Sequence, residues 1–253
     1  MSSMTDPDAP LTRDAVLGGR LILAQPARGH RIGHDAILLS ALAGPDDRTI
    51  IDFGAGVGGA GLAALIRQPA ASAVLVEREP DLAGLAAGNA AANGLEGRCR
   101  AVCADVTTLN RAGGERLEPA DLVLANPPFN LVSAHRTSPD GARARAHMAE
   151  DGLLEAWTVA AARCLKAAGR LGLILRPSEM EMLFRALSGR FGALEIRPVH
   201  PAPDRPAVRI LARAIKGRRT PPALLPPLIL ADAQGGPSTA ALAVLAGDPL
   251  APG

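Results

Sequence analysis

Apolar and polar positions alternate along the chain in blocks that predict strands followed by helices. Short runs rich in Val, Ile and Leu, such as residues 120–126, are typical of strands buried in a parallel sheet. Small and apolar residues at a spacing of three and four, as in residues 153–165, predict helices that pack one face on the sheet. The predicted strands cover residues 48–53, 72–77, 99–105, 120–126, 170–177, 193–199 and 208–217, and the predicted helices begin at about Asp35 and cover residues 60–67, 80–94, 153–165 and 178–189.

The order of these elements predicts an α/β fold. Strands that alternate with helices form parallel sheets, because each helix carries the chain back across the sheet. The last two predicted strands follow each other without a helix, so one of them is expected to run antiparallel. We therefore expect a Rossmann-like, seven-stranded, mostly parallel sheet with one antiparallel edge strand and helices on both faces.

Three segments are expected along the chain. Residues 1–45 are interpreted as an N-terminal extension with short strands and a helix, residues 46–217 as one α/β domain, and residues 218–253 as a proline-rich tail. Residues 127–151 are expected to form a long loop inside the central domain. Long loops of this kind in compact domains are usually functional or disordered.

The composition narrows the classes of protein to which the chain can belong. It has 253 residues, 48% of them hydrophobic, which is enough for one substantial core. No apolar run is long enough to cross a bilayer, and Arg20 and Pro26 interrupt the N-terminal apolar stretch, so we expect neither a membrane span nor a secretion signal. Three cysteines without a Cys-x-x-Cys spacing predict reduced thiols in a cytoplasmic protein, and no metal site.

Polar side chains gather at the carboxyl ends of four consecutive predicted strands. These ends carry Asp52, Glu77, Asp105 and Asn126. Because ligands of such sheets bind beyond the carboxyl ends of the strands, we expect one site to contain all four. A single acid could serve as a strand-end cap, but three acids at successive strand ends favour a ligand site.

A glycine-rich loop follows the first of these strands. Gly54, Gly56 and Gly59 satisfy a G-x-G-x-x-G spacing, and Glu77 follows about 20 residues later, as in dinucleotide-binding proteins. Asp52 argues against a dinucleotide, because its carboxylate would repel the two phosphates. S-adenosylmethionine (SAM) has no phosphate and carries a cationic ammonium and sulfonium, which Asp52 would favour. Glu77 can then accept hydrogen bonds from both ribose hydroxyls, and Asp105 from the adenine amine.

These residues resemble the motifs of class I SAM-dependent methyltransferases. Residues 50–65 are similar to the first motif of that group, residues 74–79 to the second and residues 103–106 to the third. The segment Leu124 to Phe129, LANPPF, resembles the (N/D/S)PP(Y/F/W) motif of amino-group methyltransferases. The resemblance implies SAM as the cofactor and residues 46–217 as the methyltransferase domain.

Two further segments resemble bacterial tRNA adenine-N6 methyltransferases. Residues 30–42, HRIGHDAILLSAL, are similar to a G-T-D-x-x-LL segment of that group, with His34 in place of the usual Thr. Residues 197–217 are similar to the end of the same group. The resemblance implies an adenine amine in tRNA as the methyl acceptor, and it extends the expected cofactor-binding set to Asp35, Asp52, Gly54, Gly56, Gly58, Glu77, Asp105 and Asn126.

The Asn-Pro-Pro-Phe stretch has a clear chemical use. An aryl amine is a poor nucleophile, because its lone pair is delocalised into the ring. The side-chain oxygen of Asn126 and the backbone carbonyl of Pro127 can accept its two N–H groups, and Pro127 and Pro128 hold these acceptors rigidly. Phe129 can stack on a base that has left its helix, which is worth roughly 1–3 kcal/mol. Asn126, Pro127, Pro128 and Phe129 are therefore the expected catalytic residues.

Basic residues near this stretch are candidates for contacts with RNA phosphates. They are Arg143, Arg145, Arg209, Arg213, Lys216, Arg218 and Arg219. Two other functions stay open. The first is methylation of a ribosomal RNA guanine or of a protein glutamine amide, since both reactions use Asn-Pro-Pro loops. The second is a non-catalytic module that binds SAM or RNA, which the intact Asn126-to-Phe129 stretch disfavours.

Overall fold

The computed structural model describes residues 10–28, 32–128 and 139–250, with the backbone alone for residues 139–151. The strands are β1 (Leu11–Val16), β2 (Leu21–Pro26), β3 (Thr49–Phe53), β4 (Ser72–Glu77), β5 (Cys99–Cys103), β6 (Ala120–Ala125), β7 (Leu165–Leu175), β8 (Phe191–His200), β9 (Arg209–Lys216), β10 (Ala223–Leu224) and β11 (Leu228–Ile229). The helices are α1 (His34–Ser40), α2 (Gly59–Arg67), α3 (Pro80–Ala92), α4 (Pro139–Cys164), α5 (Met180–Leu187) and α6 (Thr239–Ala246), with 3₁₀ turns η1 (Val106–Thr108) and η2 (Pro177–Glu179).

A mostly parallel central sheet organises the chain, as the sequence predicted. Its strands lie in the order β10-β8-β9-β7-β6-β3-β4-β5, and β11 also pairs with β8, so the described part of this sheet has nine strands where seven were expected. The two additional strands are short and parallel to β8. The reversed strand is β9, which pairs antiparallel with both β7 and β8, so it lies inside the sheet and not at its edge. The short strands β10 and β11 both belong to the C-terminal segment of the chain, which therefore extends the sheet along β8.

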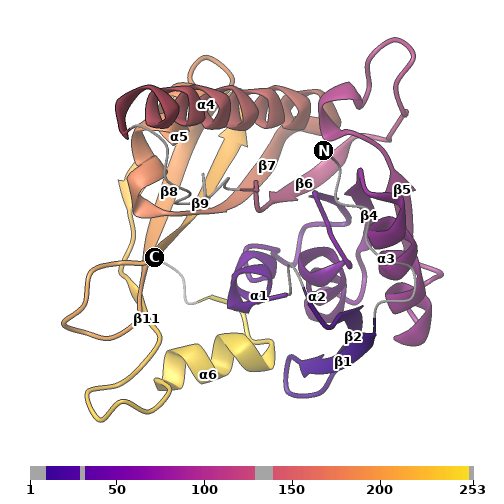
Figure 1. Cartoon of the computed structure of the whole chain (residues 1–253), viewed down its shortest axis with the longest axis horizontal. Coiled ribbons are helices and arrows are strands. Elements are labelled where there is room, and N and C mark those ends of the chain that lie inside the picture. Colours follow the sequence, from indigo (N-terminus) through magenta and orange to yellow (C-terminus); the bar gives the residue numbers. More distant parts are fainter. Residues whose placement is uncertain (1–9, 29–31, 129–138, 251–253) are drawn as a thin grey trace.

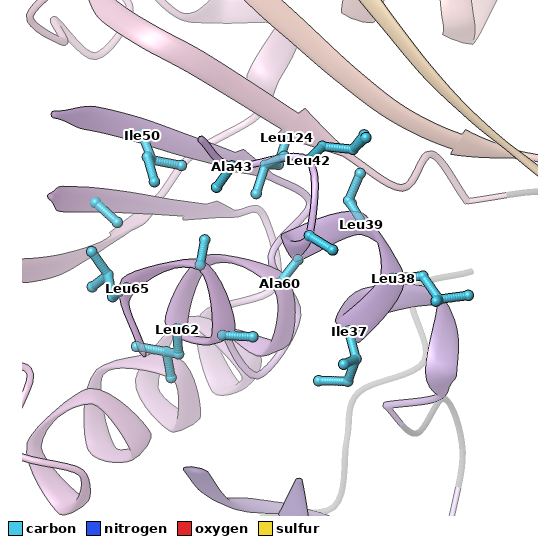
Figure 2. Packing of buried hydrophobic residues seen from close by; sticks show 14 of the residues in the cluster. Ile37, Leu38, Leu39, Leu42, Ala43, Ile50, Ala60, Leu62, Leu65 and Leu124 are labelled. Atoms are coloured by element: carbon cyan, nitrogen blue, oxygen red, sulfur yellow. The ribbon is translucent and has the colours of Figure 1, made fainter. Parts of the chain in front are cut away.

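Helices cover both faces of the sheet (Figure 1): α4 and α5 lie on one face, and α1, α2 and α6 on the other. Alternation along β3 explains how both faces are filled, because successive side chains of a strand point to opposite faces. Ile51 and Phe53 belong to the core cluster under α4, whereas Ile50 belongs to the cluster under α1 and α2. Figure 2 shows Ile50 in that second cluster with Leu39 of α1 and Leu62 of α2.

Helix α4 begins earlier than expected. It runs over Pro139–Cys164, so the second half of the predicted loop is helical. The sequence pattern missed this part because residues 139–151 have no apolar stripe. They nevertheless contain four Ala and two Arg, which favour helices by intrinsic propensity. Phe129 and the rest of the 129–138 segment lie outside the described residues.

The C-terminal segment folds back onto the domain. Arg67, at the end of α2, donates to the carbonyl oxygens of Val244 and Asp248 at 2.6 Å each, and its Nε donates to Oγ of Ser40 at 2.9 Å. A cation at the carboxyl end of α6 also complements the negative end of that helix dipole. These bonds tie α6 to α1 and α2. Within the described part of the chain, no helix combines the length and apolar character needed to cross a membrane.

Candidate active site

The register of the sheet brings the expected strand-end residues to one edge. Phe53 of β3 pairs with Val76 of β4 and with Ala125 of β6. One residue further along the parallel strands, Gly54, Glu77 and Asn126 therefore stand at the same level of the carboxyl edge. Glu77 in turn pairs with Cys103, which places Asp105 two residues beyond the same edge.

The backbone of the glycine loop has a conformation that residues with side chains rarely adopt. Gly54, Gly56 and Gly58 have φ angles of 64°, 56° and 94°, in the left-handed region that glycine adopts readily. A Cβ at Gly54 would come within 2.6 Å of the Trp157 ring, so α4 also closes the inner side of the loop. A Cβ at Gly56 would meet no atom within 4 Å. The loop thus packs tightly on its inner side and presents the Gly56 backbone to open space.

Glu77 holds the loop in this conformation. Its Oε2 accepts from the N–H of Gly56 at 2.8 Å, while Oε1 accepts from the N–H groups of Arg78 and Glu79 at 2.8 and 3.0 Å. The side chain is 7% exposed. Each carboxylate oxygen has more than one lone pair, so a ribose hydroxyl can still donate to Glu77. The expected ribose acceptor is therefore also the anchor of the glycine loop.

Asp52 lies on the α2 side of the sheet. It shares the face of Ile50, and its Oδ2 accepts from the N–H of Gly61 at 2.7 Å, with only 2% of the residue exposed. Burial is the largest cause that raises the pKa of Asp52, to about 7; the Gly61 bond lowers it and the charge of Glu77 raises it. From the sequence, this carboxylate was expected to favour the cofactor ammonium. In the structure it stands behind the glycine loop, bonded to the first turns of α2.

Asp105 lies at the surface, directly after β5. Its Oδ1 accepts from both the N–H and the Oγ of Thr107, at 2.7 Å each, and so caps the 3₁₀ turn η1. The exposed position fits a contact with a ligand at the carboxyl edge. Asn126 is half-buried at that edge, Pro127 is buried and Pro128 is exposed.

Asp35 stands on the other side of the glycine loop. It lies in the first turn of α1, and Ala36 beside it is close to Gly59, whose Cβ would come within 3.2 Å of the Ala36 Cβ. Oδ2 of Asp35 accepts from Nε of Arg209 at 2.8 Å, and the two side chains are 30% and 31% exposed. The sequence analysis had assigned these residues to different ligands, Asp35 to the cofactor and Arg209 to RNA. The structure pairs them with each other.

The predicted basic residues do not form one cluster. Strand β9 carries Arg209 at its first residue and Lys216 at its last, and it runs antiparallel to β7, pairing Ile210 with Leu175 and Ile215 with Arg170. Arg209 therefore lies at the carboxyl edge of the parallel strands, and Lys216 lies at the opposite edge. An eight-residue strand at about 3.4 Å per residue separates the two ends by roughly 25 Å.

Several of these cations also have partners inside the protein. Arg213 donates to Oε2 of Glu195 through Nε and Nη2, at 3.0 and 2.6 Å, and Nζ of Lys216 donates to the Leu165 carbonyl at 2.6 Å. Arg218 and Arg219 are exposed. They follow Lys216, so they also lie away from the edge that carries Asn126. Arg143 and Arg145 fall in the part of α4 whose side chains the structure does not describe.

Asn89 is a site residue that the sequence analysis missed. It is 2% exposed on α3, and its Nδ2 donates to the carbonyl of Val57 in the glycine loop and to that of Ala24 in β2, at 2.9 Å each. Its Oδ1 accepts from the Ala24 N–H at 2.8 Å. A single asparagine thus joins the N-terminal hairpin to the loop. The sequence shows it only as a polar residue in a predicted helix, which gives no signal of this role.

The hydrogen-bond acceptors at this edge fit SAM. Glu77 and Asp105 offer carboxylate oxygens to hydroxyl and amine groups, and Asp35 offers another in the first turn of α1. The half-buried Gly56 has no atom within 4 Å of where its Cβ would lie, which leaves space over the loop. Among the residues that the structure describes, no group of three His, Cys, Asp or Glu is placed to hold a metal ion. The three cysteines are free thiols, with Cys99 and Cys164 buried and Cys103 exposed.

Comparison with known proteins decides the family. The family model described as the methyltransferase small domain matches residues 34–196. The chain belongs to the methyltransferase small domain family. The matched segment begins at α1 and ends in β8, so it contains Gly54, Glu77, Asp105 and Asn126 of the carboxyl edge but not Arg209. The methyltransferase activity, the SAM cofactor and the Rossmann-like fold that the sequence predicted are thereby confirmed.

Two similar curated methyltransferases come from Porphyromonas gingivalis strains, and both are named tRNA1(Val) (adenine(37)-N6)-methyltransferase. One is 30% identical over 76% of this chain and 77% of its own length, and the other is 31% identical over 69% and 72%. Among solved structures, a predicted O-methyltransferase from Agrobacterium tumefaciens has a TM-score of 0.69 and 28% identity, covering 86% of this chain and 98% of that one. TrmN from Thermus thermophilus shares the fold, with a TM-score of 0.51 and 24% identity over 72% of this chain and 47% of that one.

Proposed function

We propose that this methyltransferase transfers a methyl group from SAM to the exocyclic N6 amine of an adenine in tRNA. The observation that carries the proposal is Asn126-Pro127-Pro128 at the carboxyl edge, level with Gly54 of the cofactor loop. Two relatives that match most of the chain are named for this reaction. The name of the Agrobacterium relative points to oxygen as the acceptor, but a pair of hydrogen-bond acceptors at Asn126 and Pro127 suits an amine with two N–H groups better.

The residues of the strand end act on the acceptor amine. The side-chain oxygen of Asn126 accepts one N–H and the Pro127 carbonyl accepts the other, which draws the nitrogen lone pair out of conjugation with the ring. Pro127 is buried and both prolines have restricted backbones, so the acceptors are held in place before the substrate arrives. SAM, when bound, supplies the methyl group. Phe129, which lies outside the described residues, is proposed to stack on the extruded base.

The cofactor contacts are assigned to the acids around the glycine loop. Glu77 takes the ribose hydroxyls, Asp105 takes the adenine amine, and Asp35 takes the ammonium from the first turn of α1, where the next residue, Ala36, packs near Gly59. Asp52 acts indirectly, because its carboxylate binds the Gly61 N–H and so positions the start of α2 behind Gly54, Gly56 and Gly58. The central segment, residues 46–217, then forms the catalytic domain, with the first turn of α1 closing its cofactor side.

The RNA substrate is expected to approach over the carboxyl edge. Of the basic residues on β9, only Arg209 lies at the carboxyl edge, and its ion pair with Asp35 offsets part of its positive charge. We therefore retain Arg143 and Arg145 on α4 as proposed phosphate contacts, together with Arg209. Arg213, Lys216, Arg218 and Arg219 are less suited to that role, because they lie along β9 or beyond its far end. An enzyme that acts on tRNA works in the cytoplasm of a bacterial cell, which is the location we propose.

A labelling experiment tests the substrate class. The chain is incubated with SAM carrying a labelled methyl group and total cell extract, and the products are divided between nuclease and protease treatment. We expect the label to become acid-soluble after nuclease and to survive protease. Label that persists through nuclease and is lost with protease would favour the glutamine-amide alternative. If no extract component is labelled while SAM still binds, the non-catalytic alternative is favoured.

A further inference from the structure

A hollow lies beside the proposed active site, between α4 and the segment that follows β5. Its volume is about 280 Å³, and its lining includes Thr107, Arg111, Glu155, Ala156, Val159 and Arg163. None of these six residues has a part in the reaction proposed above. The hollow is therefore available to a part of the substrate other than the acceptor base.

Thr107 connects the hollow directly to the cofactor side of the edge. Its N–H and Oγ donate to Asp105, and its carbonyl oxygen accepts from Nη2 of Arg163 at 2.8 Å. The hollow thus begins two residues after an acid assigned to the cofactor. From there it runs along α4 to Arg163, which precedes Leu165 at the opposite edge of the sheet. A substrate as large as a folded RNA covers surface well beyond Asn126, so we expect its backbone to reach this hollow.

Two guanidinium groups line this hollow. Arg163 is held in place by bonds from Nε to the Leu109 carbonyl and from Nη2 to the Thr107 carbonyl, at 3.1 and 2.8 Å. Arg111 is exposed. The pKa of Arg163 is lowered, first by burial and then by the charge of Arg111, so the two cations lie close enough to repel each other. An anion between them would relieve that repulsion and accept from the exposed guanidinium of Arg111 and from the remaining donors of Arg163.

Glu155 lowers the net positive charge of the hollow. It lies on α4, exposed, in the same lining as the two arginines. The three side chains together carry a formal charge of about +1, which matches the single negative charge of a phosphodiester. A phosphate monoester carries about two negative charges at neutral pH and would be matched less well.

We propose that this hollow binds one backbone phosphate of the RNA substrate between Arg111 and Arg163. The proposal rests on the proposed function, since it assumes an RNA substrate. It adds a phosphate contact on the α4 side of the edge, where the sequence had suggested only Arg143 and Arg145. Arg163 is held in place by its two backbone hydrogen bonds, whereas the exposed side chain of Arg111 is expected to move towards the phosphate. Glu155 limits how strongly the hollow attracts anions.

The test compares Arg111→Gln with Arg116→Gln. Arg116 is exposed on the same connection and is not part of the lining, so both variants remove one positive charge from one loop. Binding of in-vitro transcribed tRNA is measured over a range of salt concentrations. We expect Arg111→Gln to weaken binding about five- to tenfold at low salt and to lower the log–log salt slope by about 0.7 to 0.9. Arg116→Gln should change affinity less than about twofold.

Glu155→Gln gives the opposite sign and so separates a local site from general electrostatics. It should tighten tRNA binding by about two- to fivefold, because it removes a negative charge next to the phosphate. All three variants should bind SAM as the wild type does. Equal effects of Arg111→Gln and Arg116→Gln, or weaker binding by Glu155→Gln, would overturn the phosphate site while methylation of RNA by the wild type stands. Failure of the wild type to methylate RNA would reject the proposed function, and this site with it.

Discussion

Asp35 and Arg209 are 174 residues apart in the chain, yet Oδ2 of Asp35 lies 2.8 Å from Nε of Arg209. The pair joins the first turn of α1 to the start of β9, across the edge where β3 and β6 end. Because Ala36 next to Asp35 packs near Gly59, the pair also fixes α1 relative to the cofactor loop. We infer that Arg209 acts as a positioning residue for Asp35 in addition to any contact with RNA.

The first prediction concerns this pair. Asp35→Asn, Arg209→Gln and the double variant form a double-mutant cycle. Each single variant should raise the KM for SAM and destabilise the fold by about 1 kcal/mol or less, because both side chains are partly exposed. The double variant should cost less than the sum of the singles. Additive effects on the KM for SAM, together with a lower salt slope for tRNA in Arg209→Gln, would instead make Arg209 a phosphate contact alone.

Asn126 should act on the rate and not on cofactor binding. Asn126→Ala is expected to lower kcat by roughly 10²–10³-fold, by analogy with the loss of one preorganised hydrogen-bond partner at a reacting group. The affinity for SAM, measured by calorimetry, should stay near the wild-type value. Asn126→Asp keeps an acceptor of the same shape and should retain more activity than the alanine variant. Near-normal turnover by Asn126→Ala would mean that the strand end is only a rigid turn.

Asp105 should contribute to SAM binding beyond its role as the cap of η1. Asp105→Ala is expected to weaken SAM by roughly 1.5–3 kcal/mol, the usual value of a hydrogen bond to a charged group. Thr107→Val is the control, because it removes one of the two bonds that Asp105 accepts and leaves the carboxylate in place. Calorimetry should show wild-type SAM affinity for Thr107→Val. An equal loss in both variants would assign the effect to the turn and not to the carboxylate.

Asp52 should make stability depend on pH. Its pKa in the folded state is raised to about 7 from an ordinary value of 3.8, so between these values the folded protein keeps a proton that the unfolded chain has released. The contribution of Asp52 to stability is therefore highest below about pH 4, falls as the pH rises towards 7, and is level above it. Urea unfolding of the wild type and Asp52→Asn from pH 4.5 to 8.5 measures this.

Asp52→Asn should gain on the wild type as the pH rises through that window, since its amide oxygen can still accept from Gly61 and carries no charge to bury. A constant difference between the two proteins across the range would show that the Asp52 carboxylate is not protonated on folding. The comparison of variants removes the contribution of the other titrating groups.

The sequence predicted the sheet and its chemistry well, because both depend on local pattern. Apolar runs with polar residues at their ends identified β3, β4, β5 and β6, and the parallel register then brought Gly54, Glu77 and Asn126 level. The position of the reversed strand could not be read in this way. Two strands without a helix between them indicate an antiparallel pair, but they do not say which of the two, β8 or β9, lies next to β7.

Contacts between segments far apart in the chain could not be predicted from the sequence. Nothing local shows that Asp35 meets Arg209, that Asn89 bonds the carbonyl of Val57, or that β9 carries Arg209 and Lys216 to opposite edges. The hydrogen bond from the Gly61 N–H to Asp52 could not be predicted either, although alternation along β3 places Asp52 on the same face as Ile50, towards α2.

The central claim is that the acceptor is the N6 amine of an adenine in tRNA. The most direct measurement is mass spectrometry of nucleosides from tRNA that has been incubated with SAM and either the wild type or Asn126→Ala. We expect N6-methyladenosine with the wild type and a large loss of that nucleoside with Asn126→Ala. Methylguanosine in its place, or unmodified tRNA beside methylated glutamine in protein, would contradict it.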